Sequence, residues 1–130
     1  MRKKARNKME VEAENAIEEI KDIVEKSIWC GRCNNLCPVL KVMREEPSSP
    51  RGKVVILNNN GFEKTIYNCT LCKACEKQCP LDLPLTEAFL KARKVLIAGK
   101  KELPVNKEMI DNLLKTGNIY GIEQKKEEED

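Results

Sequence analysis

The chain has 130 residues, about the length of one domain, with 24 basic residues, 21 acidic residues and a formal net charge of +3. Charged residues make up 35% of it and aromatic residues only 4%, so we expect a thin hydrophobic core that needs another source of stability, such as bound metal. Seven cysteines are an odd number for a disulfide framework, and the sequence shows no secretory leader and no apolar run long enough to span a membrane. We therefore expect a reducing, cytoplasmic location in which the cysteines serve as ligands.

The first predicted elements are a flexible basic arm over residues 1–10 and a helix from Val11 to Ile28. Five of the first nine residues are Lys or Arg, and none is acidic. In the helix, apolar residues recur at helical spacing and the opposite face is acidic. This apolar stripe consists of Ala13, Ala16, Ile17, Ile20, Ile23, Val24 and Ile28. We expect it to pack on the core of the domain, and a docking helix for a basic partner is the alternative.

The first cysteine run, residues 27–38, follows this helix directly. A short helix is then predicted over residues 39–45, and the prolines that follow should end it. Ser49 is a good N-cap and Pro50 suits the first helical position, which predicts the start of a further segment. The apolar residues 54–57 in that segment fit a buried strand as well as a helix, because short apolar runs are ambiguous.

A turn at residues 58–61 leads to the second cysteine run, residues 69–80. After this run, residues 85–99 show the clearest helical periodicity, with a glycine at the end. A last helix is predicted over residues 107–115. The charged residues 122–130 are expected to form a disordered tail.

Both cysteine runs have the spacing of a bacterial iron–sulfur motif, in which three thiolates hold one cluster and the fourth ligates a second cluster. The second run contains Cys69, Cys72, Cys75 and Cys79, followed by Pro80. The first run contains Cys30, Cys33 and Cys37, followed by Pro38, and has Ser27 at the position of its first cysteine.

Crosswise pairing of the two runs predicts two interlocked clusters. Cluster B would be a 4Fe-4S cluster with the ligands Cys69, Cys72, Cys75 and Cys37. Cluster A would use Cys30, Cys33 and Cys79, with Ser27 as a possible fourth ligand. It could be a 3Fe-4S cluster, a 4Fe-4S cluster ligated by Ser27, or a 4Fe-4S cluster with one iron open to water or substrate. The three-cysteine states are favoured, because a serine oxygen is harder and less acidic than a cysteine sulfur.

Side chains beside the ligands are predicted to shape the cofactor sites. The candidate cofactor-binding residues are Ser27, Trp29, Arg32 and Lys73, with Trp29 packing on a cluster rather than relaying electrons. The flanking apolar residues are expected to exclude water from the clusters, and they are Ile28, Trp29, Leu36, Val39, Leu71 and Leu81.

Two other interpretations of the composition are weaker. Structural zinc prefers separated cysteine pairs, and three cysteines within seven residues would crowd one tetrahedral ion. Residues 26–122 hold sixteen basic and nine acidic residues, an excess that could indicate nucleic-acid binding. However, two thiolate-ligated clusters would offset about half of this excess, and no series of aromatic residues is present for stacking. We therefore expect no nucleic-acid partner. The absence of histidine also excludes a Rieske-type centre.

The two runs, with the segments Ser49–Gly52 and Thr116–Gly121, resemble the small iron–sulfur proteins of the heterodisulfide reductase C-subunit type over about residues 12–121. The same module is similar to the iron–sulfur subunits of glycolate, lactate and anaerobic glycerol-3-phosphate oxidases, and to the C-terminal half of the succinate dehydrogenase iron–sulfur subunit. The resemblance implies a mainly α fold, the α-helical ferredoxin, over residues 11–121. It also implies that residues 54–57 are helical.

The resemblance further implies a role in anaerobic redox metabolism. In these families the module lies between a reductant, often a flavin-containing subunit, and a catalytic unit or a cysteine-rich CCG domain. We therefore expect an electron-transfer subunit of an oxidoreductase complex, without catalysis of its own. The alternatives are a hydro-lyase-like or substrate-binding protein that uses an open iron of cluster A, and an interaction or regulatory module held together by its clusters.

Overall fold

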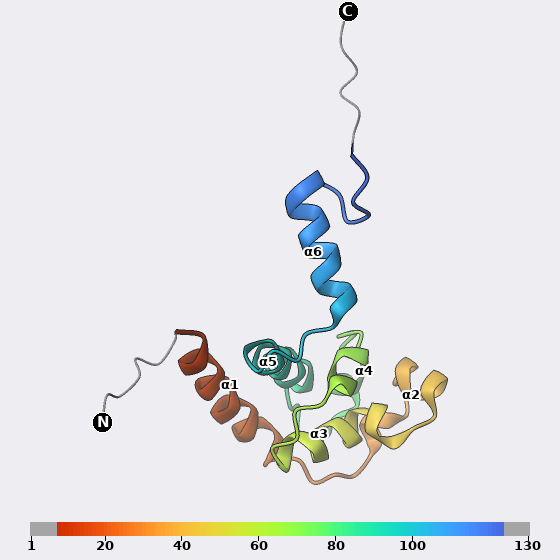
Figure 1. The fold of residues 1–130 in the computed structure, drawn as a ribbon. Helices are drawn as coiled ribbons and strands as arrows, with labels where there is room; N and C mark the ends of the chain where they lie inside the picture. The colour runs from red at the N-terminus through yellow and green to blue at the C-terminus, as the bar shows by residue number, and fades with distance from the viewer. Residues whose placement is uncertain (1–7, 124–130) are drawn as a thin grey trace, which may run out of the picture.

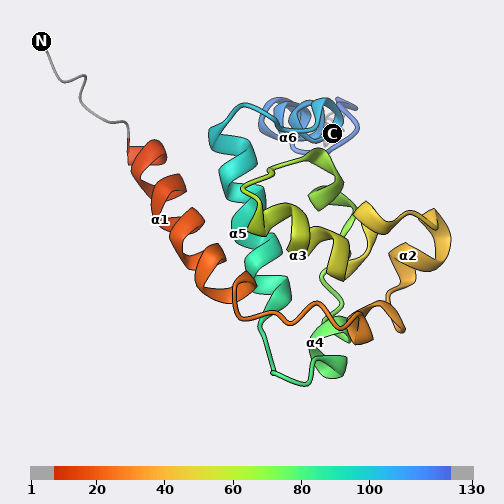
Figure 2. The same cartoon turned by 90° about the horizontal axis from the view of Figure 1, so that it is seen from below.

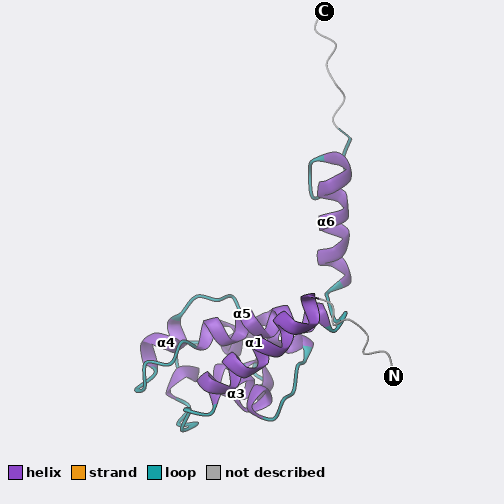
Figure 3. Cartoon of the chain, turned by 90° about the vertical axis from the view of Figure 1, so that its left-hand side faces the viewer, coloured by secondary structure: helices purple, strands orange, loops and turns teal. Residues whose placement is uncertain are grey.

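The computed structural model describes residues 8–123, and most of the predicted arm and tail, residues 1–7 and 124–130, lies outside the described residues. Within residues 8–123 the chain is helical and contains no strand (Figure 1, Figure 3). The helices are α1 (Lys8–Val24), α2 (Pro38–Met43), α3 (Pro50–Asn58), α4 (Ala74–Gln78), α5 (Leu85–Ala98) and α6 (Pro104–Thr116). Short 3₁₀ helices lie between them: η1 (Arg32–Asn34), η2 (Glu46–Ser48) and η3 (Lys64–Asn68). The predicted mainly α fold is confirmed.

The core lies where α1, α3 and α5 pack together (Figure 2). Their buried apolar residues are Ile20 and Val24 from α1, Val54 and Leu57 from α3, and Ala88, Phe89, Ala92 and Leu96 from α5. The cysteine runs connect these helices and contain little regular structure of their own. The three-helix core is therefore the scaffold from which both cysteine runs extend.

The boundaries of α1 differ from the predicted ones at both ends. The helix begins at Lys8, three residues before Val11, and ends at Val24. The backbone N–H of Ser27 donates to the carbonyl of Val24 at 3.1 Å, which closes a turn where the sequence predicted four more helical residues. Ile28 is 66% exposed as a result, so its prediction as part of the buried stripe is wrong.

Helix α3 begins as the capping residues predict. The Ser49 hydroxyl accepts a hydrogen bond from the backbone N–H of Gly52 at 2.8 Å, and Pro50 occupies the first turn. Residues 54–57 are helical, in agreement with the expectation from the resemblance. The short helix predicted over residues 39–45 is observed as α2, Pro38–Met43.

The last two helices have different environments. Helix α5 has the predicted extent, and Lys91 on it pairs with Glu87 at 2.5 Å and with Glu19 of α1 at 2.8 Å. Helix α6 starts earlier than predicted, at Pro104, and ends before Gly117, whose φ of 78° suits a glycine cap. Among the described residues α6 buries none of its side chains and projects away from the core (Figure 3).

No helix in the described part of the chain is long and apolar enough to cross a membrane.

Candidate metal centres

One cavity collects cysteines from both runs, and we call it cavity B. Its cysteines are Cys37 from the first run and Cys69, Cys72 and Cys75 from the second. Lys53 of α3 and Phe89 of α5 also line it. Including its open mouth, the cavity holds about 340 Å³ of space. This is the set of four cysteines that crosswise pairing predicts for cluster B.

A second cavity, cavity A, collects the other three cysteines. These are Cys30 and Cys33 from the first run and Cys79 from the second. Ser27, Trp29 and Arg51 lie in its lining, and it holds about 380 Å³ including its mouth. No three His, Cys, Asp or Glu side chains of residues 8–123 converge closely enough to hold a single metal ion. The thiols therefore surround two separate spaces and do not converge on one ion-sized point.

The two runs share a local backbone geometry in which Ser27 matches Cys69. The backbone N–H of Leu71 donates to the Cys69 sulfur at 3.4 Å, and the N–H of Trp29 donates to the Ser27 hydroxyl at 3.2 Å. Leu71 and Trp29 both have positive φ, at 57° and 54°. Ser27 thus occupies the place of a first ligand in the run, on the wall of cavity A.

The thiols differ in how readily they lose a proton. Burial, together with the neighbouring Cys69, raises the pKa of Cys75 to about 12. Burial also raises the pKa of Cys33. The pKa of Cys72 is lowered, first by a hydrogen bond from the backbone of Ala74. Because ligands must be deprotonated, the buried thiols become thiolates only when cations bind beside them, which is the behaviour expected of metal ligands.

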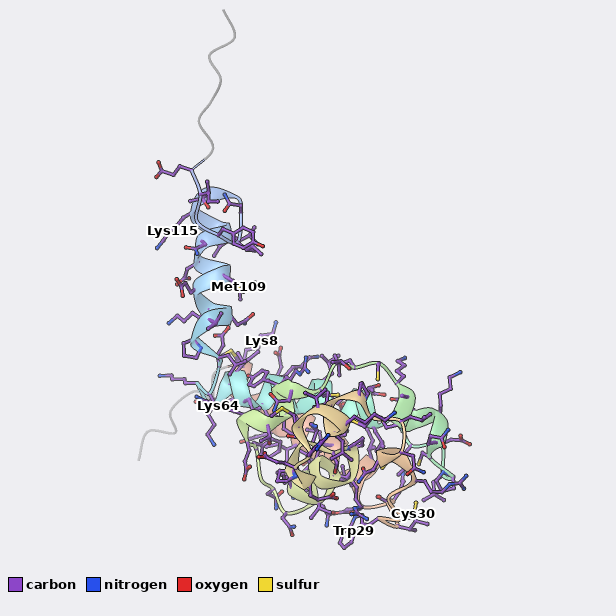
Figure 4. All side chains as sticks on the ribbon, turned by 90° about the vertical axis from the view of Figure 1, so that its right-hand side faces the viewer. Lys8, Trp29, Cys30, Lys64, Met109 and Lys115 are labelled. Carbon is purple, nitrogen blue, oxygen red and sulfur yellow. The ribbon has the colours of Figure 1, made fainter. Side chains whose placement is uncertain are left out.

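The structure places three of the four predicted cofactor-binding residues at the cavities. Ser27 and Trp29 line cavity A, and Lys73 lines cavity B. Arg32 is exposed on η1 and lines neither cavity, whereas Arg51 of α3 lies beside cavity A. Figure 4 shows Trp29 and Cys30 at the outer edge of the molecule.

The expected apolar shell is not closed. Ile28, Trp29, Leu36 and Leu81 are between 45% and 66% exposed. Ile28, Trp29 and Leu81 lie at the mouth of cavity A, whereas Leu36 lines neither cavity. The expectation of a water-excluding shell is therefore wrong for these four residues.

Sequence analysis missed the basic residues that α3 and α5 bring to the cavities. Lys53 is 1% exposed and lines cavity B, and Arg93 donates to the backbone carbonyl of Cys69. Arg51 pairs with Glu46 at 2.7 Å beside cavity A. Two of these residues follow Ser49-Pro50 directly, so the conspicuous capping segment could have directed attention to them.

The family model described as "4Fe-4S dicluster domain" matches residues 23–83, which include both cysteine runs. The expected resemblance to iron–sulfur dicluster proteins is confirmed over these residues, which make up just under half of the chain. The match supports an iron–sulfur cofactor, and the assignment of individual ligands stays a prediction.

Curated relatives match the same part of the chain. Lactate utilization protein B of Anoxybacillus flavithermus is 30% identical over 94 residues, which cover 66% of this chain and 20% of the relative. The protein of the same name from Exiguobacterium sp. is 32% identical over 89 residues, or 62% of this chain and 19% of the relative. An uncharacterized electron transport protein, YkgF of Escherichia coli, is 31% identical over 86 residues, or 60% and 18%. The chain spans about a fifth of the length of these relatives.

The residues at both cavities fit the cofactor of a dicluster domain. Cavity B offers four soft thiolate donors, the complete set for a 4Fe-4S cluster. Cavity A offers three thiolates and the Ser27 hydroxyl. Cys37 and Cys69 also accept backbone N–H bonds, from Leu40 and Leu71, which fix the direction of their sulfurs. Such bonds also tune a bound cluster.

Proposed function

We propose that this chain is an iron–sulfur electron-transfer subunit, which relays single electrons between a flavin-containing donor and a catalytic or CCG-type partner in the cytoplasm. When bound, two clusters would supply one-electron chemistry without proton transfer. The observation that carries the proposal is the division of seven cysteines between two adjoining cavities, each built from both runs. The names of the relatives, which refer to lactate utilization and electron transport, support it.

Helix α4 makes the connection between the two cavities short. Cys75 lies in α4 on cavity B, and Cys79 follows its last residue on cavity A. The two residues are four positions apart, which corresponds to about 6 Å along a helix axis at a rise of 1.5 Å per residue. Cys33 of cavity A is also an electrostatic neighbour of Cys75. Two clusters in these cavities would therefore be close enough to exchange electrons directly.

Each cavity also has an exposed cysteine at its mouth, Cys30 for cavity A and Cys72 for cavity B. Exposed apolar side chains lie beside these mouths. Trp29 lies at cavity A, and Val42 lines a surface hollow that shares Thr70 with cavity B. An electron can thus enter at one mouth and leave at the other. This arrangement favours a relay between two partners over a closed redox store.

The alternative functions predict different observations. A hydro-lyase would need acid or base groups near an open iron, and Arg51 is the charged side chain in the lining of cavity A. A substrate-induced change in the cluster A spectrum would favour this alternative. An interaction module would still bind its partner when its clusters can no longer be reduced and reoxidised.

An anaerobic reductive titration tests the proposed function. The protein should take up about two electrons, one per cluster, and return both to an added oxidised acceptor. A chain that takes up none, or that cannot pass them on, is not an electron-transfer subunit. Co-purification of the native protein should then identify the flavin-containing or CCG-type partner.

For the cofactors we propose a 4Fe-4S cluster at cavity B and a 3Fe-4S or incompletely cysteine-ligated 4Fe-4S cluster at cavity A. The Ser27 hydroxyl supports a defined fourth position, since it accepts the same local backbone hydrogen bond as the Cys69 sulfur. Serine is nevertheless the weaker ligand for iron.

Replacing Ser27 with Cys should convert cavity A into a second complete thiolate site. We expect about eight irons per chain, which is a rise if the wild-type protein holds about seven, and any 3Fe-4S signal should disappear from the EPR spectrum. Ser27→Ala is the matched control, because it leaves the iron content unchanged if three cysteines suffice. An altered cluster A signal in Ser27→Ala would instead show that the hydroxyl ligates iron. A Ser27→Cys protein with unchanged iron and spectrum would contradict the assignment of this position.

A further inference from the structure

Lys53 is a buried basic residue on α3. It is 1% exposed, and its Nζ donates to the backbone carbonyl of Ser48. Among the described residues no carboxylate forms an ion pair with it. Lysine is almost never fully buried without a partner, because losing the hydration of an ammonium group is strongly unfavourable. The described residues therefore supply no ion-pair partner for the Lys53 ammonium group.

The groups that face Lys53 are the ligands of cavity B. Lys53 lines this cavity together with Cys37, Cys69 and Cys75. Negative charge held in the cavity would therefore lie beside the buried Lys53 ammonium group.

A second basic residue lies on the same side. Arg93 of α5 donates to the carbonyls of Cys69 and Tyr67, the latter at 3.3 Å, and its guanidinium lies 5.9 Å from the centre of the Tyr67 ring. Glu76, a charged neighbour of Cys75, directs its Oε1 to the backbone N–H of Thr86 at 2.9 Å. The charged residues that line cavity B are therefore Lys53 and the more exposed Lys73, and Arg93 lies behind them on the backbone of Cys69.

Cavity A has the opposite arrangement. Its basic residue, Arg51, is bonded through Nε to Glu46 at 2.7 Å, and the two side chains are 41% and 49% exposed. The charge beside cavity A is thus paired and screened by water, whereas the charge of Lys53 is neither. This difference predicts that the two cavities stabilise negative charge unequally.

We propose that Lys53 is the buried countercharge of the cluster at cavity B and raises the reduction potential of that cluster. This inference rests on the proposed electron-transfer function. A 4Fe-4S core with four thiolates carries a formal charge of about −2, and one added electron makes it about −3. A fixed positive charge in a medium of low dielectric constant stabilises the more negative state more strongly. Lys53 therefore favours the reduced form.

The test is an EPR-monitored redox titration of the holoprotein carrying Lys53→Met. The substitution keeps the length of the side chain and removes its charge. Lys107→Met is the matched control, because it removes the same charge from an exposed position on α6. We expect Lys53→Met to lower the equilibrium constant for reduction of cluster B at least tenfold, which is about 59 mV for one electron. Cluster A and the Lys107→Met protein should shift much less.

The wild-type titration separates this inference from the function on which it rests. If wild-type protein carries two reducible clusters and Lys53→Met leaves the potential of cluster B unchanged, the role of Lys53 is refuted and the function stands. If wild-type protein carries no reducible cluster at cavity B, both fail. Raising the ionic strength should not remove the effect of Lys53→Met, since a buried charge is screened little by salt.

Two further variants apply if Lys53→Met does not retain cluster B. Lys53→Arg keeps the charge and Lys53→Gln removes it, and both keep a polar side chain. Retention of cluster B in Lys53→Arg alone supports a countercharge. If both variants retain the cluster, its equilibrium constant for reduction should be at least tenfold lower in Lys53→Gln than in Lys53→Arg, and equal constants would overturn the proposal. Retention in Lys53→Gln alone or in neither variant would also overturn it.

Discussion

Replacing Cys37 with Ser is expected to alter the cluster bound by the second cysteine run, more than thirty residues further along the chain. Cys37 belongs to the first run, but its sulfur lines cavity B with Cys69, Cys72 and Cys75. The Cys37 side chain also caps α2 by accepting from the N–H of Leu40, and serine is a good cap, so the fold should survive the change. The variant gives cavity B three cysteines and a serine, the donor set of cavity A. We therefore expect the EPR signal of cluster B to change to that of an incompletely cysteine-ligated cluster while the cluster A signal persists.

The reciprocal variant is Cys79→Ser. Cys79 closes the second run, but it lines cavity A with Cys30 and Cys33. We expect this variant to affect cluster A and to leave cluster B complete, and the iron content of each variant should fall by about half at most. If each run instead held its own cluster, Cys37→Ser would damage the cluster of Cys30 and Cys33, and this would contradict the crosswise arrangement.

Replacing Gly52 with Ala should strongly destabilise the fold. A Cβ on Gly52 would lie 1.8 Å from the backbone carbonyl oxygen of Glu46 and 3.1 Å from the Cα of Pro47. The obstacle is backbone, so no side-chain rotation can relieve it, and α3 would have to separate from η2. We expect a loss of about 3 kcal/mol or more in the free energy of unfolding, at or above the usual cost of overpacking. Chemical denaturation of the holoprotein measures this.

Gly99→Ala is the matched control for that loss. Gly99 has a φ of −80°, and the nearest atom to its Cβ would be the Val95 carbonyl oxygen, at 3.5 Å. Alanine fits this conformation, so the variant should be as stable as wild type or more stable by about 0.4–1 kcal/mol. Equal stabilities of the two variants would show that the approach of α3 to η2 is not essential.

Most of the fold could be predicted from the sequence because its long helices carry clear signals. The apolar spacing of residues 85–99 and the Ser49-Pro50 cap defined α5 and the start of α3. Helix α4 was not predicted, since five residues are too short for a periodic pattern and its preceding residue, Lys73, has a φ of 62°. The end of α1 at Val24 depends on a turn that the apolar pattern does not reveal.

The cysteine groups could be predicted because ligand spacing is itself the signal, and the structure brings together the sulfurs that crosswise pairing requires. The surroundings of the cysteines could not be predicted in this way. Lys53 appears in the sequence as an ordinary surface lysine, and only the packing of α3 against the cysteine runs shows that it is buried. Arg93 reaches the backbone of Cys69 from a helix 24 residues away.

The most direct test of the account is the iron, sulfide and zinc content of the anaerobically purified protein, measured together with its EPR spectrum. We expect about seven or eight irons per chain and signals from two distinct clusters. About seven irons support a 3Fe-4S cluster at cavity A, and about eight support a 4Fe-4S cluster there. A protein that contains zinc and no iron, or a single cluster of about four irons, would contradict the two interlocked clusters on which the proposed function depends.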